Sequence, residues 1–203
     1  MRDAVFWTAV ALIFLLGALA TKTYDNEFFF FAGYAILQAT IMATAWNILG
    51  GFTGYVNFGS AGFFAIGAYT SVALHQALEP SMLVLLLVAA LLGGLVGLGT
   101  GYLTLRLRGV YFAIATLALA IVFETFVNNW GYVGGATGAY ILTPETVFFF
   151  DSYIEFLFGL MLFLAVMAVA IARQMQVSRI GKGLAAIRDD EVAAECMKHR
   201  SST

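Results

Sequence analysis

Long uncharged stretches dominate the pattern of polar and apolar positions along this chain. They are residues 4–21, 28–78, 80–105, 109–123, 125–144 and 156–172. A helix needs about 20 mostly apolar residues to cross the hydrocarbon core of a bilayer, so the longest stretch can hold two such helices. We therefore predict about six spans, at approximately 4–21, 28–48, 56–75, 81–104, 110–128 and 153–172.

The apolar runs favour helices rather than strands. Residues 82–90 are continuously apolar, without the alternation of a membrane strand. Helices also satisfy their own backbone hydrogen bonds, which lipid cannot do for them. The expected fold class is an all-α integral membrane protein with about six transmembrane helices.

The first stretch has two interpretations. Arg2, followed by an apolar run that ends in Ala18-Leu19-Ala20, is typical of a cleaved signal peptide. Asp3 offsets the charge of Arg2, however, and a multispan protein follows. We prefer a retained first span.

The composition excludes a soluble domain and a nucleic-acid-binding protein. The 203 residues are 62% hydrophobic and 11% charged, against about 25% charged in soluble domains. The net charge is −2, so the chain has no basic field that would attract phosphate backbones. The lipid bilayer is therefore an expected partner, and nucleic acid is not.

Basic residues lie mostly on one side of the six-span topology. With the N-terminus inside, the outer side holds only Lys22. The inner side holds Arg2, Arg106, Arg108, Arg173, Arg179, Lys182, Arg188, Lys198 and Arg200. Because cytoplasmic loops carry the excess of Lys and Arg, this asymmetry predicts that both termini are cytoplasmic.

A glycine-rich stretch at residues 49–62 separates the second and third spans. It is either a flexible loop before a small-residue helix face, or a broken or re-entrant helix beside a translocation path. Irregular backbone at membrane depth is tolerated where it is buried in protein or lines a cavity. The fifth span adds a carboxylate, which at depth is a functional candidate, although this one lies near the outer interface. The candidate path residues are Gly54, Asn57, Gly59, Ser60 and Glu124.

Two other glycine patterns predict packing. Gly93, Gly97 and Gly101 share one helix face, where small residues let two helices approach closely. Packing within this chain is the preferred interpretation, and a contact between subunits is the alternative. Residues 129–140, outside on this topology, combine glycines with aromatic residues and predict a tight interfacial loop that can meet an external partner.

Many of the few charged residues of this chain lie after the last span, in residues 181–198. Good helix formers follow Gly183, and acidic residues precede the basic ones, an order that complements the helix dipole. Alanines and a few larger apolar residues leave a small apolar surface. We predict a helix that docks on another protein, with a solvated amphipathic helix as the alternative.

Patterns for catalysis or for a bound cofactor are missing from the sequence. A phosphate-binding loop with Gly181-Lys182 as its Gly-Lys pair would need another glycine at position 176. This chain has Gln176 there. His75 and His199 are far apart and lack metal-ligand spacing. We expect no enzyme activity, no metal and no cofactor.

Three segments, in this order, resemble the LivM-type permease subunit of branched-chain amino acid ABC importers. The first, residues 46–70, begins Trp-Asn-Ile-Leu-Gly-Gly-Phe-Thr-Gly-Tyr-Val-Asn-Phe-Gly. The second, residues 105–118, begins Leu-Arg-Leu-Arg-Gly, and the third, residues 183–195, contains Ala-Ile-Arg-Asp-Asp-Glu. With the Gly-Gly-Ala-Thr-Gly at 134–138, the resemblance spans about residues 35–197.

The resemblance implies a multi-pass subunit of the bacterial inner membrane. It implies a second, LivH-type permease subunit, two cytoplasmic ATP-binding subunits that hydrolyse ATP, and an external solute-binding protein. The solute is then a branched-chain or related small amino acid, with urea and short amides in the wider family. The third segment resembles the loop that couples the permease to the ATPase subunits, with Glu191 and Glu195 on its docking surface and Gly183 as a hinge. The coupling residues so implied are Gly183, Ala186, Arg188, Asp190, Glu191, Ala194 and Glu195.

We expect an incomplete permease core at residues 1–176 and a cytoplasmic coupling loop with a truncated tail at 177–203. Family members usually continue with further spans, whereas this chain stops at Thr203. Two alternatives stay open. One is an ion-coupled secondary transporter, which would show inverted repeats and paired broken helices. The other is a truncated membrane fragment that does not transport.

Overall fold

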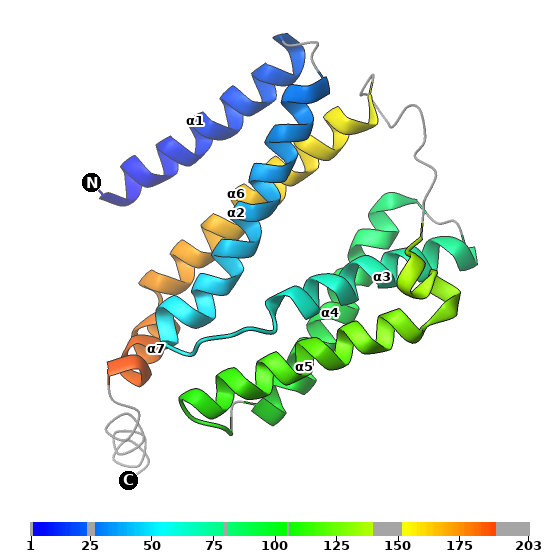
Figure 1. The fold of residues 1–203 in the computed structure, drawn as a ribbon. Coiled ribbons are helices and arrows are strands. Elements are labelled where there is room, and N and C mark those ends of the chain that lie inside the picture. The colour runs from blue at the N-terminus through cyan, green and yellow to red at the C-terminus, as the bar shows by residue number, and fades with distance from the viewer. Residues whose placement is uncertain (1, 24–26, 79–80, 105, 140–151, 190–203) are drawn as a thin grey trace. The chain divides into compact units, whose positions relative to one another are not determined.

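The computed structural model describes residues 2–23, 27–78, 81–104, 106–139 and 152–189. These ranges contain seven α-helices, two 3-10 helices and no strand, which confirms the all-α fold (Figure 1). The elements are α1 (Arg2–Thr23), α2 (Glu27–Thr53), α3 (Ser60–Leu78), α4 (Met82–Thr104), α5 (Val110–Asn129), η1 (Gly131–Val133), η2 (Gly135–Thr137), α6 (Tyr153–Val177) and α7 (Arg179–Asp189).

Within the described ranges, four helices are long and apolar enough to cross a membrane: α2, α4, α5 and α6. Their bounds agree closely with four of the predicted spans, because uninterrupted apolar runs determine both. Helices α1 and α3 occupy the two remaining predicted positions. Helix α3 begins at Ser60 rather than near residue 56, because residues 54–59 are not helical. The chain is a membrane protein.

The chain forms two compact units, Met1–Thr53 with Thr143–Thr203 and Gly54–Leu142. In the first unit α2 lies along α6, with the rings of Phe30 and Phe158 5.6 Å apart. Helix α1 lies along α6 in the opposite direction, since Gly17 abuts Leu162 while Phe6 lies against Arg173 (Figure 1). The C-terminal ends of α2 and α6 therefore lie together, beside the N-terminal half of α1.

In the second unit α3 packs against both α4 and α5. Gly62 is buried on α5, where an added Cβ would lie 2.9 Å from the Phe123 ring and 3.4 Å from the Cα of Ala120. Gly59, one turn earlier, lies against Thr116. The pairing of 59 with 116 and 62 with 120 makes α3 and α5 parallel.

Two glycines of the predicted α4 stripe have open space around their Cα atoms. An added Cβ at Gly93 or at Gly97 would have nothing within 4 Å among the described residues. Packing of these two glycines against another helix of this chain therefore stays a prediction. Both glycines are half-buried, whereas Leu87, Leu91 and Leu98, on an adjacent face of α4, are exposed.

Candidate functional site: a broken helix and a terminal helix that packs beside its first half

The glycine-rich segment contains a true break between α2 and α3. Gly54 has a φ of 77°, a left-handed conformation that glycine adopts without steric cost. The side-chain oxygen Oδ1 of Asn57 accepts a hydrogen bond of 2.7 Å from the backbone N–H of Gly59. The carbonyl of Gly59 then accepts the first helical bonds of α3, from Gly62 and Phe63. Residues 54–59 therefore form a non-helical segment with its own hydrogen bonds, and their interpretation as a broken helix stays a prediction.

The break is anchored on α5 through Thr116, which is buried. The Thr116 hydroxyl donates to the carbonyl of Ala113, at 3.0 Å, and accepts from the backbone N–H of Phe58, at 3.2 Å. The ring of Tyr55 also lies 5.0 Å from that of Phe112 on the same helix. These contacts give the non-helical segment a hydrogen-bond partner and an aromatic partner on α5.

Four of the five candidate path residues lie together at this break, and the fifth does not. Gly54, Asn57 and Gly59 lie within it, and Ser60 begins α3. Glu124 lies on α5 eight residues beyond Thr116, or about 12 Å along the helix axis, and it is exposed. Its neighbour Phe123, rather than Glu124, faces α3.

Sequence reasoning did not single out Thr116 as a site residue. The sequence does contain one indication of Thr116, because it is a hydroxyl residue inside the apolar run 109–123. Many threonines in such runs bond only to their own helix, as Thr125 does through the carbonyl of Ile121. The partner that distinguishes Thr116 is 58 residues away in sequence.

Replacing Thr116 by valine should weaken the break. The change preserves shape, but it leaves the Phe58 N–H without its acceptor, which costs about 1–3 kcal/mol. In a chain of this size we expect Tm to fall by about 2–4 °C per kcal/mol. Thermal unfolding in detergent measures this, with Thr125→Val as the control because it removes only a bond within one helix. Equal shifts for the two variants would show that Thr116 does not anchor the break.

Helix α7 follows α6 after a sharp corner at Ser178. The Ser178 hydroxyl donates to the carbonyl of Met175, at 2.7 Å, and accepts from the backbone N–H of Gly181, at 3.2 Å. Gly181 is buried here, and an added Cβ would lie 2.1 Å from the Met175 carbonyl oxygen. The corner therefore depends on a glycine that sequence reasoning did not select.

Helix α7 packs against both α2 and α6. Arg188 donates a hydrogen bond of 3.2 Å to the carbonyl of Gly51, three residues before the break begins. Ala186 is half-buried, whereas Gly183 is exposed with open space around its Cα. The remaining coupling candidates lie outside the described residues: Asp190, Glu191, Ala194 and Glu195. Within the described ranges, no group of His, Cys, Asp and Glu side chains could hold a metal ion.

Comparison with known proteins identifies the family of this chain. Residues 28–197 match the family described as "Branched-chain amino acid transport system / permease component". The chain is 28% identical, over 182 residues, to the "High-affinity branched-chain amino acid transport system permease protein LivM" of Escherichia coli (strain K12). That match covers 77% of this chain and 43% of the relative.

A second relative supports the same assignment. The protein of the same name from Salmonella typhimurium (strain LT2) is also 28% identical over 182 residues, with the same shares of 77% and 43%. The matched region thus spans less than half the length of these relatives. No solved structure matches the chain. Because the family match covers residues 28–197, most of the chain, the chain belongs to the permease-component family of branched-chain amino acid transport systems.

Proposed function

We propose that the chain acts as a permease subunit of an ATP-binding cassette importer, which moves branched-chain or related small amino acids across the bacterial inner membrane. Family membership supports the transport role. The single observation that carries the coupling role is the packing of α7 on the end of α2, with Arg188 bonded to Gly51. A force on α7 would thereby reach α2 just before its break.

In the proposed orientation α7 lies on the cytoplasmic side. The end of the first unit where α2 and α6 finish carries Arg173, Arg179, Lys182 and Arg188, whereas Glu27 and Glu155 lie in the first turns of the same two helices. Cytoplasmic ends of membrane helices are enriched in Lys and Arg. The antiparallel arrangement of α1 and α6 places the N-terminal half of α1 at the same cytoplasmic end.

In the proposed mechanism, ATP binding and hydrolysis take place on two cytoplasmic partner subunits. These subunits would hold α7 and the residues that continue it, Asp190, Glu191, Ala194 and Glu195. Their closure would shift the equilibrium between inward-open and outward-open states of a pathway shared with a second, LivH-type permease subunit. Gly54, Asn57, Gly59 and Ser60 would flank that pathway, and an external binding protein would deliver the solute. The permease core would reach residue 176 and the coupling part would follow from 177.

Uptake of radiolabelled leucine tests this function. The chain is expressed with the permease, ATP-binding and solute-binding proteins of its own system, in a strain that lacks branched-chain amino acid import. We expect uptake that persists when an uncoupler removes the ion gradient while ATP is maintained. Loss of uptake under the uncoupler would identify a secondary transporter. Absence of uptake in every condition would identify a fragment that does not transport.

Charge reversal tests the coupling surface separately. Glu191→Lys with Glu195→Lys should reduce co-purification of the ATP-binding subunit at least tenfold, because two charges of the proposed interface are reversed together. Glu27→Lys is the matched control, since Glu27 is exposed in the first turn of α2, at the opposite end from α7. Undiminished co-purification in the double variant would contradict the coupling role.

A further inference from the structure

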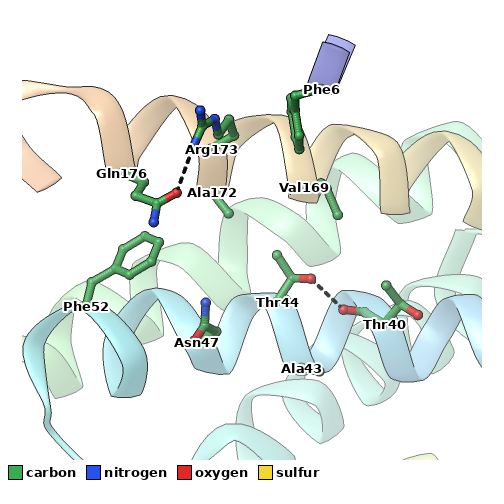
Figure 2. Close-up of a pocket in the computed structure, with 10 residues that line it drawn as sticks. All are labelled: Phe6, Thr40, Ala43, Thr44, Asn47, Phe52, Val169, Ala172, Arg173 and Gln176. Atoms are coloured by element: carbon green, nitrogen blue, oxygen red, sulfur yellow. Dashed lines mark hydrogen bonds between the residues drawn. The ribbon is translucent and has the colours of Figure 1, made fainter. Parts of the chain in front are cut away.

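The first unit contains a pocket of about 520 Å³ near the ends of α2 and α6 (Figure 2). Helix α2 forms one wall and α6 the other, and Phe6 of α1 closes one side. The lining residues are Phe6, Thr40, Ala43, Thr44, Asn47, Phe52, Val169, Ala172, Arg173 and Gln176. The polar members from α2, Thr40, Thr44 and Asn47, follow helical spacing along one face inside an otherwise apolar helix.

The pocket has the hydrogen-bonding character of an anion site. The guanidinium of Arg173 donates to Oε1 of Gln176, at 3.2 Å, and lies 5.5 Å from the centre of the Phe6 ring. These contacts hold the cation at the pocket. Figure 2 shows the amide nitrogen of Gln176 turned toward α2 and that of Asn47 turned toward α6. The lining thus brings together one cation and two amide donors, and the described lining residues include no Asp or Glu.

The two threonines add no further donors. The hydroxyl of Thr40 donates to the carbonyl of Ile36, at 2.9 Å, and that of Thr44 donates to the carbonyl of Thr40, at 2.7 Å. Their protons are therefore committed to their own helix. A bound anion would rely on Arg173, Asn47 and Gln176, which favours a group with a single negative charge.

The position of the pocket favours a membrane lipid over a dissolved solute. Arg173 lies four residues before the end of α6, a candidate span, and the basic start of α7 follows. Lipid headgroups lie at such span ends. Val169 and Ala172 provide apolar surface beside the cation, which suits a glycerol backbone and the start of an acyl chain. A free amino acid would instead bring an ammonium group, for which the described lining residues provide no carboxylate.

We propose that this pocket binds the phosphate group of an anionic membrane phospholipid, with Arg173 as its principal cation. The lipid would bridge α2 and α6 at the end where α7 packs. Phosphatidylglycerol carries one negative charge and no ammonium group, so it fits the lining better than phosphatidylethanolamine or phosphatidylcholine. One basic residue at a membrane surface contributes roughly a fivefold preference for anionic lipid.

Native mass spectrometry of the full 203-residue chain tests the proposal, with phosphatidylglycerol and phosphatidylcholine of identical acyl chains. We expect phosphatidylglycerol to be retained preferentially, and Arg173→Gln to lower that preference about fivefold. Gln176→Glu is a second variant of nearly the same shape, whose carboxylate would repel the lipid phosphate and lower the preference similarly. Arg106→Gln is the matched control, because Arg106 is an exposed arginine beside a helix end and bonds to Tyr102.

Three outcomes would overturn the proposal. The first is an equal loss of preference in Arg173→Gln and Arg106→Gln, which would show that lipid responds only to total charge. The second is displacement of the lipid by millimolar inorganic phosphate, which would make this a site for free phosphate. The third is displacement by millimolar leucine, with loss of leucine binding in Arg173→Gln, which would make it a solute site.

Discussion

Replacing Gly181 by alanine should move α7 out of place and lower ATP-driven uptake about fivefold or more. The new Cβ would lie 2.1 Å from the carbonyl oxygen of Met175 and 2.9 Å from that of Gln176. Both obstacles are backbone atoms of the preceding turn, so neither can rotate away as a side chain would. Overpacking of this kind costs about 1–3 kcal/mol, which corresponds to a population shift of roughly 5-fold to 150-fold.

The neighbouring Gly183 provides the control for this prediction. An added Cβ at Gly183 meets nothing within 4 Å, and the residue is exposed in the same helix. Alanine also forms helix better than glycine by about 1 kcal/mol, so Gly183→Ala should leave uptake close to that of the unmodified chain. Leucine uptake and co-purification of the ATP-binding subunit are measured for both variants. A hinge role for Gly183 would give the reverse order, with Gly183→Ala the more damaging change.

The positions of the helices could be predicted from the sequence, because a membrane span depends on the hydropathy of consecutive residues and not on distant ones. An apolar run such as 82–104 has one way to satisfy its backbone in lipid, so α4 and its bounds could be predicted from composition alone. The start of α3 was less accurate. Asn57 and Gly59 build a cap in residues that hydropathy alone assigns to a span.

The site residues were predictable only where their chemistry is local. Gly54 and Asn57 could be selected because a glycine and an amide within an apolar stretch indicate a break. Thr116 and Gly181 could not, since a distant N–H and the carbonyls of the preceding turn distinguish them from similar residues nearby. Arg173 illustrates the same limit. It resembled one more cytoplasmic charge until the fold placed it between Phe6 and the polar face of α2.

Replacing Gly134 by alanine should be among the most destabilising single-methyl changes in the second unit. Gly134 has a φ of 86° between η1 and η2, and an added Cβ would lie 2.1 Å from the carbonyl oxygen of Gly138. A left-handed conformation costs a residue with a Cβ about 1–2 kcal/mol before any clash is counted. The turn also holds Val133, which is fully buried. Loss of this turn would therefore disturb the end of α5.

Gly131 is the matched control for Gly134, since an added Cβ there meets nothing within 4 Å. Thermal unfolding should show a lower Tm for Gly134→Ala, by about 2–4 °C per kcal/mol, and little change for Gly131→Ala.

Uptake and co-purification of the ATP-binding subunit, measured for Gly134→Ala, show on which side of the membrane this turn lies. In the proposed orientation this loop is external, and it presents Trp130 and Tyr132, two exposed aromatic rings 6.4 Å apart. Gly134→Ala should then reduce uptake that depends on the binding protein while the ATP-binding subunit still co-purifies. Loss of that subunit instead would place the loop on the cytoplasmic side and reverse the orientation.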